Sequence, residues 1–271
     1  MAEHRAAPVP QIAGVAAGAA CFAVLVVSAT AWALDVRELN GASIWAKPMK
    51  FGLSFGLHML TLVWLATLLD ERARQGRSIA IVIVSAGLAS ILEVLYVALQ
   101  AARGRASHFN TETPLESFLY YQIMGGAALV LVGATFVLGW LILRNSLRSI
   151  GPGLITGAAL GAMLSAAATL VTAGALAAGV IDGPGHWVGG VRTDAYGLPL
   201  VGWATRGGDL RVPHFFATHM IQALPIVGIV ADRTGMPMAR TLVLIAALAA
   251  LAVTVLTFAQ AIAGRPFLIV P

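Results

Sequence analysis

Three ionisable side chains lie inside stretches of the sequence that are otherwise apolar. His58, Glu93 and His219 occur in three separate apolar blocks. An ionisable group inside a bilayer is costly and usually faces a bundle interior or a water-filled cavity. Imidazole is the commonest side-chain metal ligand, and haem iron accepts histidines as axial ligands. A carboxylate can orient such a histidine or transfer a proton, so Glu93 is the catalytic candidate.

Other polar residues share helix faces with these three side chains or lie in the adjoining loops. Residues three or four apart meet on one helix face, which places Ser54 beside His58 and Gln222 beside His219. A polar cavity is therefore expected around the three ionisable groups. Its predicted lining consists of Lys47, Lys50, Ser54, Tyr96, Gln100, Arg103, Arg105, Asn110, Gln122 and Gln222.

Two further histidines and two arginines extend the set of possible cofactor ligands. His108 and His214 are expected near His58 and His219, which makes four candidate metal-ligating histidines. Arg206 and Arg211 are candidate partners for the propionates of a haem. The single cysteine, Cys21, excludes a disulfide framework or a cysteine-based zinc site within one chain.

The composition indicates which elements must position these residues. Hydrophobic residues make up 59% of the 271 residues and charged residues 11%, whereas soluble domains contain about 45–50% apolar and about 25% charged residues. About 20 apolar residues suffice for a transmembrane helix. We therefore predict an all-α, polytopic bundle of seven helices in a single domain, 1–271. The predicted helices are 11–33, 49–69, 79–100, 118–143, 153–181, 214–231 and 241–263.

The loops indicate how this bundle is oriented in a bacterial inner membrane, surrounded by membrane lipids. The connections after the second, fourth and sixth helices are short and basic, whereas the others are longer and mixed in charge. Short basic loops tend to stay in the cytoplasm. We therefore expect a cytoplasmic N-terminus and an outer C-terminus. The long connection from Asp182 to Pro213 is expected to form a small extracytoplasmic cap.

The three ionisable groups are expected at a similar depth in the bundle. At 1.5 Å per residue, each lies roughly 9–15 Å from the outer helix ends. Their convergence favours a buried, outward-opening site that binds haem b or a transition metal ion for membrane-associated redox chemistry.

A zinc-dependent hydrolase of a lipid-like substrate is a second hypothesis. The segment Ser54-Phe-Gly-Leu-His58 resembles the Ser-xxx-His element of the ceramidase and adiponectin-receptor-like zinc hydrolases. That family also has an Asp on the next helix and His-xxx-His on the last, whereas this chain has Glu93 and the pair His214 and His219. Five residues along an ideal helix separate this pair by about 140°.

A transporter or receptor for a small anionic or lipid-like ligand is the third hypothesis. The basic residues are scattered between apolar blocks, which argues against nucleic acid as a partner. The chain has no Walker-type phosphate loop, no dinucleotide-binding glycine motif and no Cys-x-x-Cys. The last predicted helix contains no lysine for a retinal Schiff base.

Overall fold

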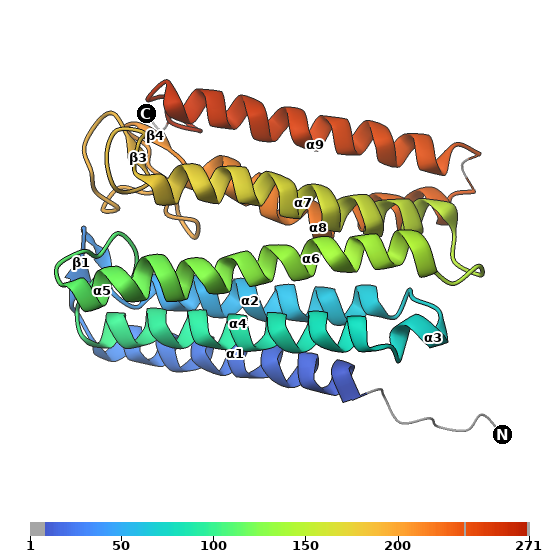
Figure 1. Cartoon of the computed structure of the whole chain (residues 1–271). Helices are drawn as coiled ribbons and strands as arrows, with labels where there is room; N and C mark the ends of the chain where they lie inside the picture. The colour runs from blue at the N-terminus through green and yellow to red at the C-terminus, as the bar shows by residue number, and fades with distance from the viewer. Residues whose placement is uncertain (1–8, 236, 270–271) are drawn as a thin grey trace.

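The computed structural model describes residues 9–235 and 237–269, and helices dominate this part of the chain (Figure 1). Seven helical segments in it are long and apolar enough to cross a membrane. They are α1 (Val9–Leu34), α2 (Ala46–Ala66), α4 (Arg77–Ala102), the continuous segment Pro114–Asn145, α7 (Pro152–Ala178), α8 (Arg211–Arg233) and α9 (Ala239–Ile262). The segment Pro114–Asn145 comprises α5 (Pro114–Phe118), the π-helical turn η1 (Leu119–Met124) and α6 (Gly125–Asn145). A short helix, α3 (Glu71–Arg74), lies between α2 and α4.

The prediction of seven helices is confirmed, and the boundaries differ for local reasons. The fourth helix begins earlier than expected, because Thr113 caps α5 by accepting a hydrogen bond from the Glu116 backbone N–H. The fifth helix ends earlier, because Gly179 adopts the left-handed conformation that terminates α7. The sixth helix continues through Pro225 without a break.

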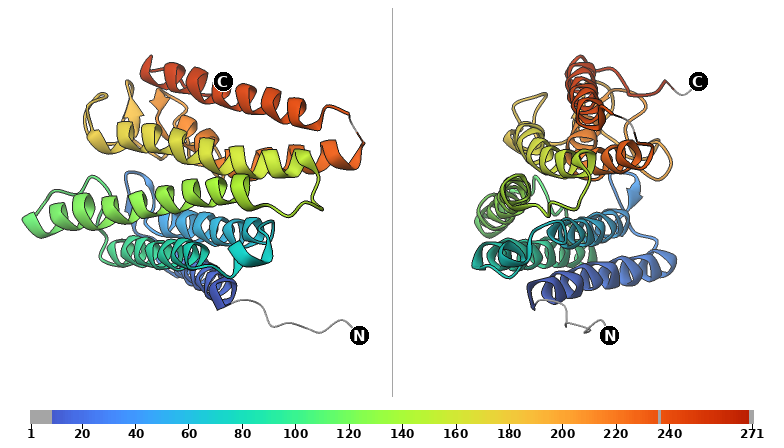
Figure 2. Two further views of the ribbon diagram at one scale, coloured as in Figure 1. Left: turned by 45° about the vertical axis from the view of Figure 1, so that its right-hand side comes forward. Right: turned by 90° about the vertical axis from the view of Figure 1, so that its right-hand side faces the viewer.

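The helices form two groups that α6 joins (Figures 1 and 2). One group contains α1, α2 and α4, and the other contains α7, α8 and α9. Helix α6 packs on α4 in the first group and on α7 in the second. Helices α2 and α8 are not among the helix pairs that pack extensively in residues 9–235 and 237–269. This loosely packed interface matters below, because α2 and α8 carry three of the histidines.

Glycine allows α7 and α8 to approach closely in the second group. Gly157 packs against the Leu224 backbone, and a Cβ at Gly161 would lie 2.8 Å from the Met220 carbonyl oxygen. At the start of α7, the Asp232 carboxylate accepts hydrogen bonds from the backbone N–H groups of Gly153 (2.8 Å) and Leu154 (2.7 Å). The small residues allow backbone contact in lipid, and the carboxylate satisfies two helix-end donors.

The long loops gather at one end of the bundle, which we call the cap end. The hairpin β1 (Glu38–Leu39) and β2 (Ala42–Ser43) lies there, with Asn40 and Gly41 at positive φ in its turn. A second antiparallel pair, β3 (Trp187–Val188) and β4 (Gly208–Asp209), forms within the connection between α7 and α8. The helix α1 begins at the opposite end and α9 ends at the cap end (Figure 1).

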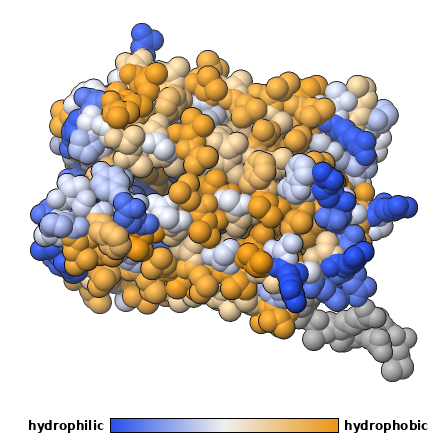
Figure 3. Space-filling model, viewed as in Figure 1, coloured by the Kyte–Doolittle hydropathy of each residue, from blue (hydrophilic) through white to orange (hydrophobic). Residues whose placement is uncertain are grey.

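The flanks of the bundle are apolar, whereas hydrophilic side chains gather toward its two ends (Figure 3). Exposed residues on these flanks include Ile81, Leu88, Leu248, Val255 and Leu256. A soluble protein of this size does not expose so much apolar surface. The chain therefore has the organisation of a multi-pass membrane protein.

The α7–α8 packing generates the first prediction. Gly157→Ala places a methyl group against the Leu224 backbone, so we expect a loss of about 1–3 kcal/mol in the free energy of unfolding. Gly174→Ala in the same helix is the control, because a Cβ there meets no atom within 4 Å. Thermal unfolding in detergent measures both variants. Equal stability of the two would contradict the packing argument.

Candidate functional site

His58 on α2 is fixed by a threonine on α6. The His58 Nε2 atom lies 3.1 Å from Thr135 Oγ1, and the Thr135 hydroxyl also lies 2.8 Å from the Leu131 carbonyl oxygen. Because the carbonyl can only accept, the hydroxyl proton belongs to that contact, and His58 Nε2–H donates to Thr135. This network assigns the imidazole tautomer and leaves the Nδ1 lone pair available.

Hydrogen bonds also orient the two histidines on α8, but through Nδ1, whereas His58 uses Nε2. His219 Nδ1 donates to the Phe215 carbonyl oxygen at 2.8 Å, and the imidazole stacks on the Phe215 ring. His214 Nδ1 lies 3.2 Å from the hydroxyl of Thr172, which itself donates to the Ala168 carbonyl. Both histidines therefore keep Nε2 available. His219 lies close enough to both His58 and His214 for a charge on its ring to act on them. We call such groups electrostatic neighbours.

The side chains of α2 and α8 meet across the loosely packed interface between these helices. Gln222 Nε2 donates to Thr61 Oγ1 at 3.3 Å. The Gln222 Oε1 atom is buried and has no hydrogen-bond partner among the described residues. A buried acceptor without a partner indicates that water or a ligand belongs beside it.

A second group of polar residues lies nearer the cap end. Lys47, on the first turn of α2, places its ammonium 5.9 Å from the centre of the Phe51 ring. His108, in the connection after α4, contacts Phe51 and Tyr120 with ring centres 5.4 and 5.6 Å away. Burial lowers the pKa of His108 well below its ordinary value, and the charges of Lys47 and His214 lower it further. His108 is therefore a neutral ring at pH 7.

Glu93 is 4% exposed and belongs to this second group. Its electrostatic neighbour is Lys47, and its carboxylate makes no hydrogen bond or ion pair in the described part of the chain. The expected triad of His58, Glu93 and His219 is therefore divided between two groups. His108 is an electrostatic neighbour of Lys47 and of His214, which connects the groups.

A chain of hydrogen bonds along α4 leads from the level of Glu93 to the cap end. Gln100 Nε2 donates to the Tyr96 hydroxyl at 3.0 Å, and Arg103 donates to Gln100 Oε1 at 3.0 Å. Arg103 and Arg105 both form ion pairs with the buried carboxylate of Glu116. Tyr96 and Gln100, which were both expected to line the cavity, are therefore joined by a hydrogen bond on one face of α4.

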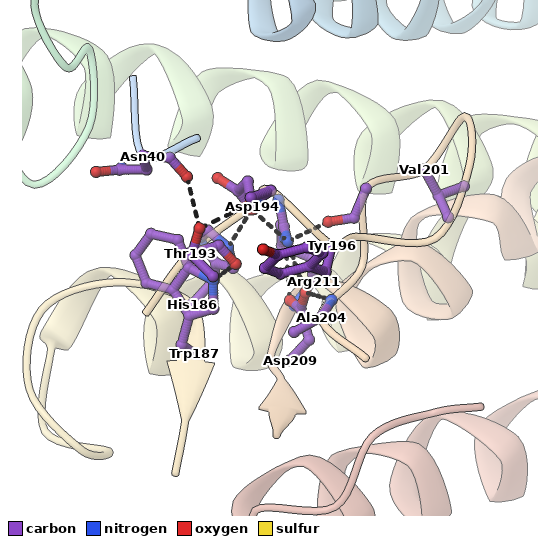
Figure 4. Close-up of polar contacts among 12 residues, drawn as sticks. Asn40, His186, Trp187, Thr193, Asp194, Tyr196, Val201, Ala204, Asp209 and Arg211 are labelled. Atoms are coloured by element: carbon purple, nitrogen blue, oxygen red, sulfur yellow. Dashed lines mark hydrogen bonds and ion pairs between the residues drawn. The ribbon is translucent and has the colours of Figure 1, made fainter. Parts of the chain in front are cut away.

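The connection between α7 and α8 folds over this end around Arg211 (Figure 4). The Arg211 guanidinium contacts Asp209 at 2.7 Å, Asp194 at 3.0 Å and the Gly202 carbonyl oxygen at 2.6 Å. His186 lies 3.2 Å from the same Asp194 oxygen. The Asp209 side chain is fully buried. Arg211 therefore holds the cap connection to the first turn of α8.

The cap connection also contacts the first group of helices. The Asn40 carbonyl oxygen accepts hydrogen bonds from the Asp194 backbone N–H (2.8 Å) and the Thr193 hydroxyl (3.1 Å). Lys50 Nζ donates to the Val201 carbonyl oxygen at 2.9 Å. These contacts tie the two helix groups together at the cap end, on the side where α2 and α8 are loosely packed.

Several expected site residues have other roles. Arg211 is engaged by two carboxylates, and Arg206 is exposed and stacks over the Tyr196 ring, so neither guanidinium lies free beside the histidines. Ser54 and Gln122 are exposed. Asn110 donates to the Ala106 carbonyl and accepts from the Glu112 N–H, which shapes the loop.

The expectation of a metal ion bound by several of the four histidines is not supported. Within residues 9–235 and 237–269, no three His, Cys, Asp or Glu side chains gather closely enough to hold one. Separate hydrogen bonds orient His58 toward Thr135, His214 toward Thr172 and His219 toward the Phe215 carbonyl oxygen.

The residues that orient the histidines were not predicted from the sequence. Thr135 and Thr172 lie on helices other than those of their partner histidines, so no spacing in the sequence indicates the contacts. The role of Asp194 was also missed, because the fold of a long glycine-rich connection has no periodic signal.

Comparisons of this chain with protein-family models, with curated proteins and with solved structures find no match. The class of protein is therefore inferred from the fold and the site alone. The chain is a seven-helix membrane protein whose polar side chains, in the described bundle, fall into two groups, one around His58, His214 and His219 and one around Lys47, His108 and Glu93.

The cap generates the second prediction. Arg211→Met leaves the buried Asp209 carboxylate without its cation, and breaking such a pair costs about 3–5 kcal/mol. We expect faster hydrogen exchange throughout 180–210 in the variant. Arg206→Met, at an exposed arginine in the same connection, is the control. Unchanged exchange in Arg211→Met would show that the guanidinium does not organise the cap.

The lowered pKa of His108 generates the third prediction. The unfolded chain binds a proton at this residue at a higher pH than the folded chain, so stability falls as the pH drops below about 6.5. Thermal unfolding between about pH 7.5 and about pH 5 should therefore show a smaller loss in His108→Gln than in the wild type. Identical losses would mean that His108 does not titrate on unfolding.

Proposed function

We propose that this chain is a bacterial inner-membrane protein that binds haem b between α2 and α8 and serves electron transfer at its outer side. The observation that carries the proposal is the state of His58 and His219. They lie on facing helices, are electrostatic neighbours, and each has one ring nitrogen held by an oxygen and the other available.

The residues present fit this cofactor in three respects. Haem needs only two protein ligands, so the lack of a three-residue metal group does not count against it. In metal sites, the second ring nitrogen of a ligand histidine characteristically donates an N–H hydrogen bond to a carbonyl or similar acceptor. His219 makes such a bond to the Phe215 carbonyl oxygen. The helices that carry the ligands are not among the extensively packed helix pairs of the described residues.

Bound haem would supply one-electron chemistry, while the residues around it would control position and charge. Thr135 and the Phe215 carbonyl hold the two imidazoles in orientation. Glu93, beside Lys47, provides a carboxyl group that takes up or releases a proton when the charge of the site changes. The hydrogen bonds from Tyr96 to Arg103 connect that level of α4 with the cap end.

The distribution of basic residues supports the proposed orientation. Short connections at the end opposite the cap contain Arg72, Arg74, Arg77, Arg144, Arg148, Arg233 and Arg240. Because basic residues of short loops remain in the cytoplasm, the cap end would face outward.

The two other hypotheses have less support. A zinc hydrolase requires three protein ligands in most catalytic sites, and the described residues provide no such group. A receptor or carrier for a small anion is favoured by one observation, the unpaired ammonium of Lys47.

An absorption spectrum tests the proposed function directly. We expect a Soret band and stoichiometric iron in protein purified from cells supplied with haem precursor, with both lost in His58→Ala and His219→Ala. His186→Gln is the control, because that histidine contacts Asp194 in the cap. Absence of the band after reconstitution with haem would refute the proposal. Equal haem content in all three variants would refute the ligand assignment.

A further inference from the structure

We propose that Lys47 is the anion-binding residue of this site and that the ligand is a carboxylate carried on an apolar body. The inference rests on the proposed function where that ligand is haem, whose propionates are such carboxylates. A long-chain fatty acid from the membrane has the same chemistry.

The two lysines of the chain stand in contrasting environments. Lys47 and Lys50 are the only lysines, so 15 of the 17 basic residues are arginines. Lys50 Nζ is engaged by the Val201 carbonyl oxygen at 2.9 Å. Lys47 is exposed, and its ammonium makes no hydrogen bond or ion pair within residues 9–235 and 237–269.

The charged groups around Lys47 are already engaged or lie too far away to pair with it. Asp194, whose charge acts on Lys47, binds Arg211 at 3.0 Å. Glu93 is an electrostatic neighbour but lies beyond ion-pair distance of the ammonium. Because Lys47 is exposed, its ammonium is accessible to an anion from outside the chain, and a charge-assisted hydrogen bond to such an anion is stronger than one between neutral groups.

The aromatic side chains beside Lys47 indicate what kind of chemical group the anion must be attached to. The Phe51 ring lies 5.9 Å from the ammonium and contacts Phe55 and His108 edge to face. Tyr120 packs against His108 on the other side. The surface is aromatic, and its histidine, His108, is a neutral ring at pH 7. One carboxylate attached to an apolar or planar body matches this combination.

The location agrees with the proposed haem. Lys47 lies on the first turn of α2 and His214 on the first turn of α8, and the charges of both act on His108. The two arginines first considered for propionates are engaged elsewhere, which leaves Lys47 as the cation available to one. The contact is an ion pair with a hydrogen bond and involves no covalent step.

Haem and its dimethyl ester distinguish this inference from the proposed function. The ester keeps the iron and the ring but has no carboxylate. We expect the wild type to bind haem about tenfold more tightly than the ester, in line with the loss of one charge-assisted contact. Lys47→Gln should bind both equally, and Lys47→Arg should retain part of the preference. Optical titration of the purified full-length variants measures both affinities.

The outcomes distinguish the role of Lys47 from the proposed binding of haem. Equal binding of haem and ester by the wild type overturns the role of Lys47 and leaves haem binding intact. If neither binds, the proposed function fails, and oleate in detergent becomes the probe. Protection of Lys47, but not of Lys50, from amine acetylation by oleate, read by mass spectrometry, would then support the inference. Equal acetylation of Lys47 with and without oleate would overturn it.

Discussion

The ion pairs of Arg211 with Asp194 and Asp209 are the interaction on which the cap end depends. The Asp209 side chain is fully buried, and a buried carboxylate is tolerated only when a cation and hydrogen bonds compensate its charge. Arg211 is also the first residue of α8. One guanidinium therefore fixes both the fold of the cap and the level at which α8 begins, which in turn sets the depth of His214 and His219.

The same need for a polar partner explains how the histidines are hydrogen-bonded. An imidazole in an apolar bundle needs a partner for its N–H, and threonine hydroxyls or helix carbonyls supply one for His58, His214 and His219. Because each acceptor can engage only the donating nitrogen, the second nitrogen remains available on every ring. A set of potential ligands thus arises from ordinary hydrogen-bond satisfaction, before any cofactor is considered.

The sequence predicted the helices well and the site only in part, for different physical reasons. A membrane helix is specified by its own apolar length, so seven spans were evident from local composition. The polar stripe of Tyr96 and Gln100 was also predictable, since it depends on spacing within one helix. The contacts of His58 with Thr135, and of Asn40 with the cap, join distant segments and leave no local signal. The exposure of Ser54 shows the limit of helix-face reasoning, because a shared face does not say what that face contacts.

Close packing elsewhere distinguishes the interface of α2 and α8, which is the proposed binding site, from the rest of the bundle. Gly157 and Gly161 bring α7 against α8, and Gly52 brings α2 against the backbone of α1. Each of the two helix groups is thus consolidated by backbone contact, while α2 and α8 meet through side chains such as Gln222 and Thr61. Polar side chains without full partners, namely Lys47 and Gln222, lie on these same two helices. A ligand at this boundary displaces side-chain contacts, whereas a ligand within either group would have to separate helix backbones.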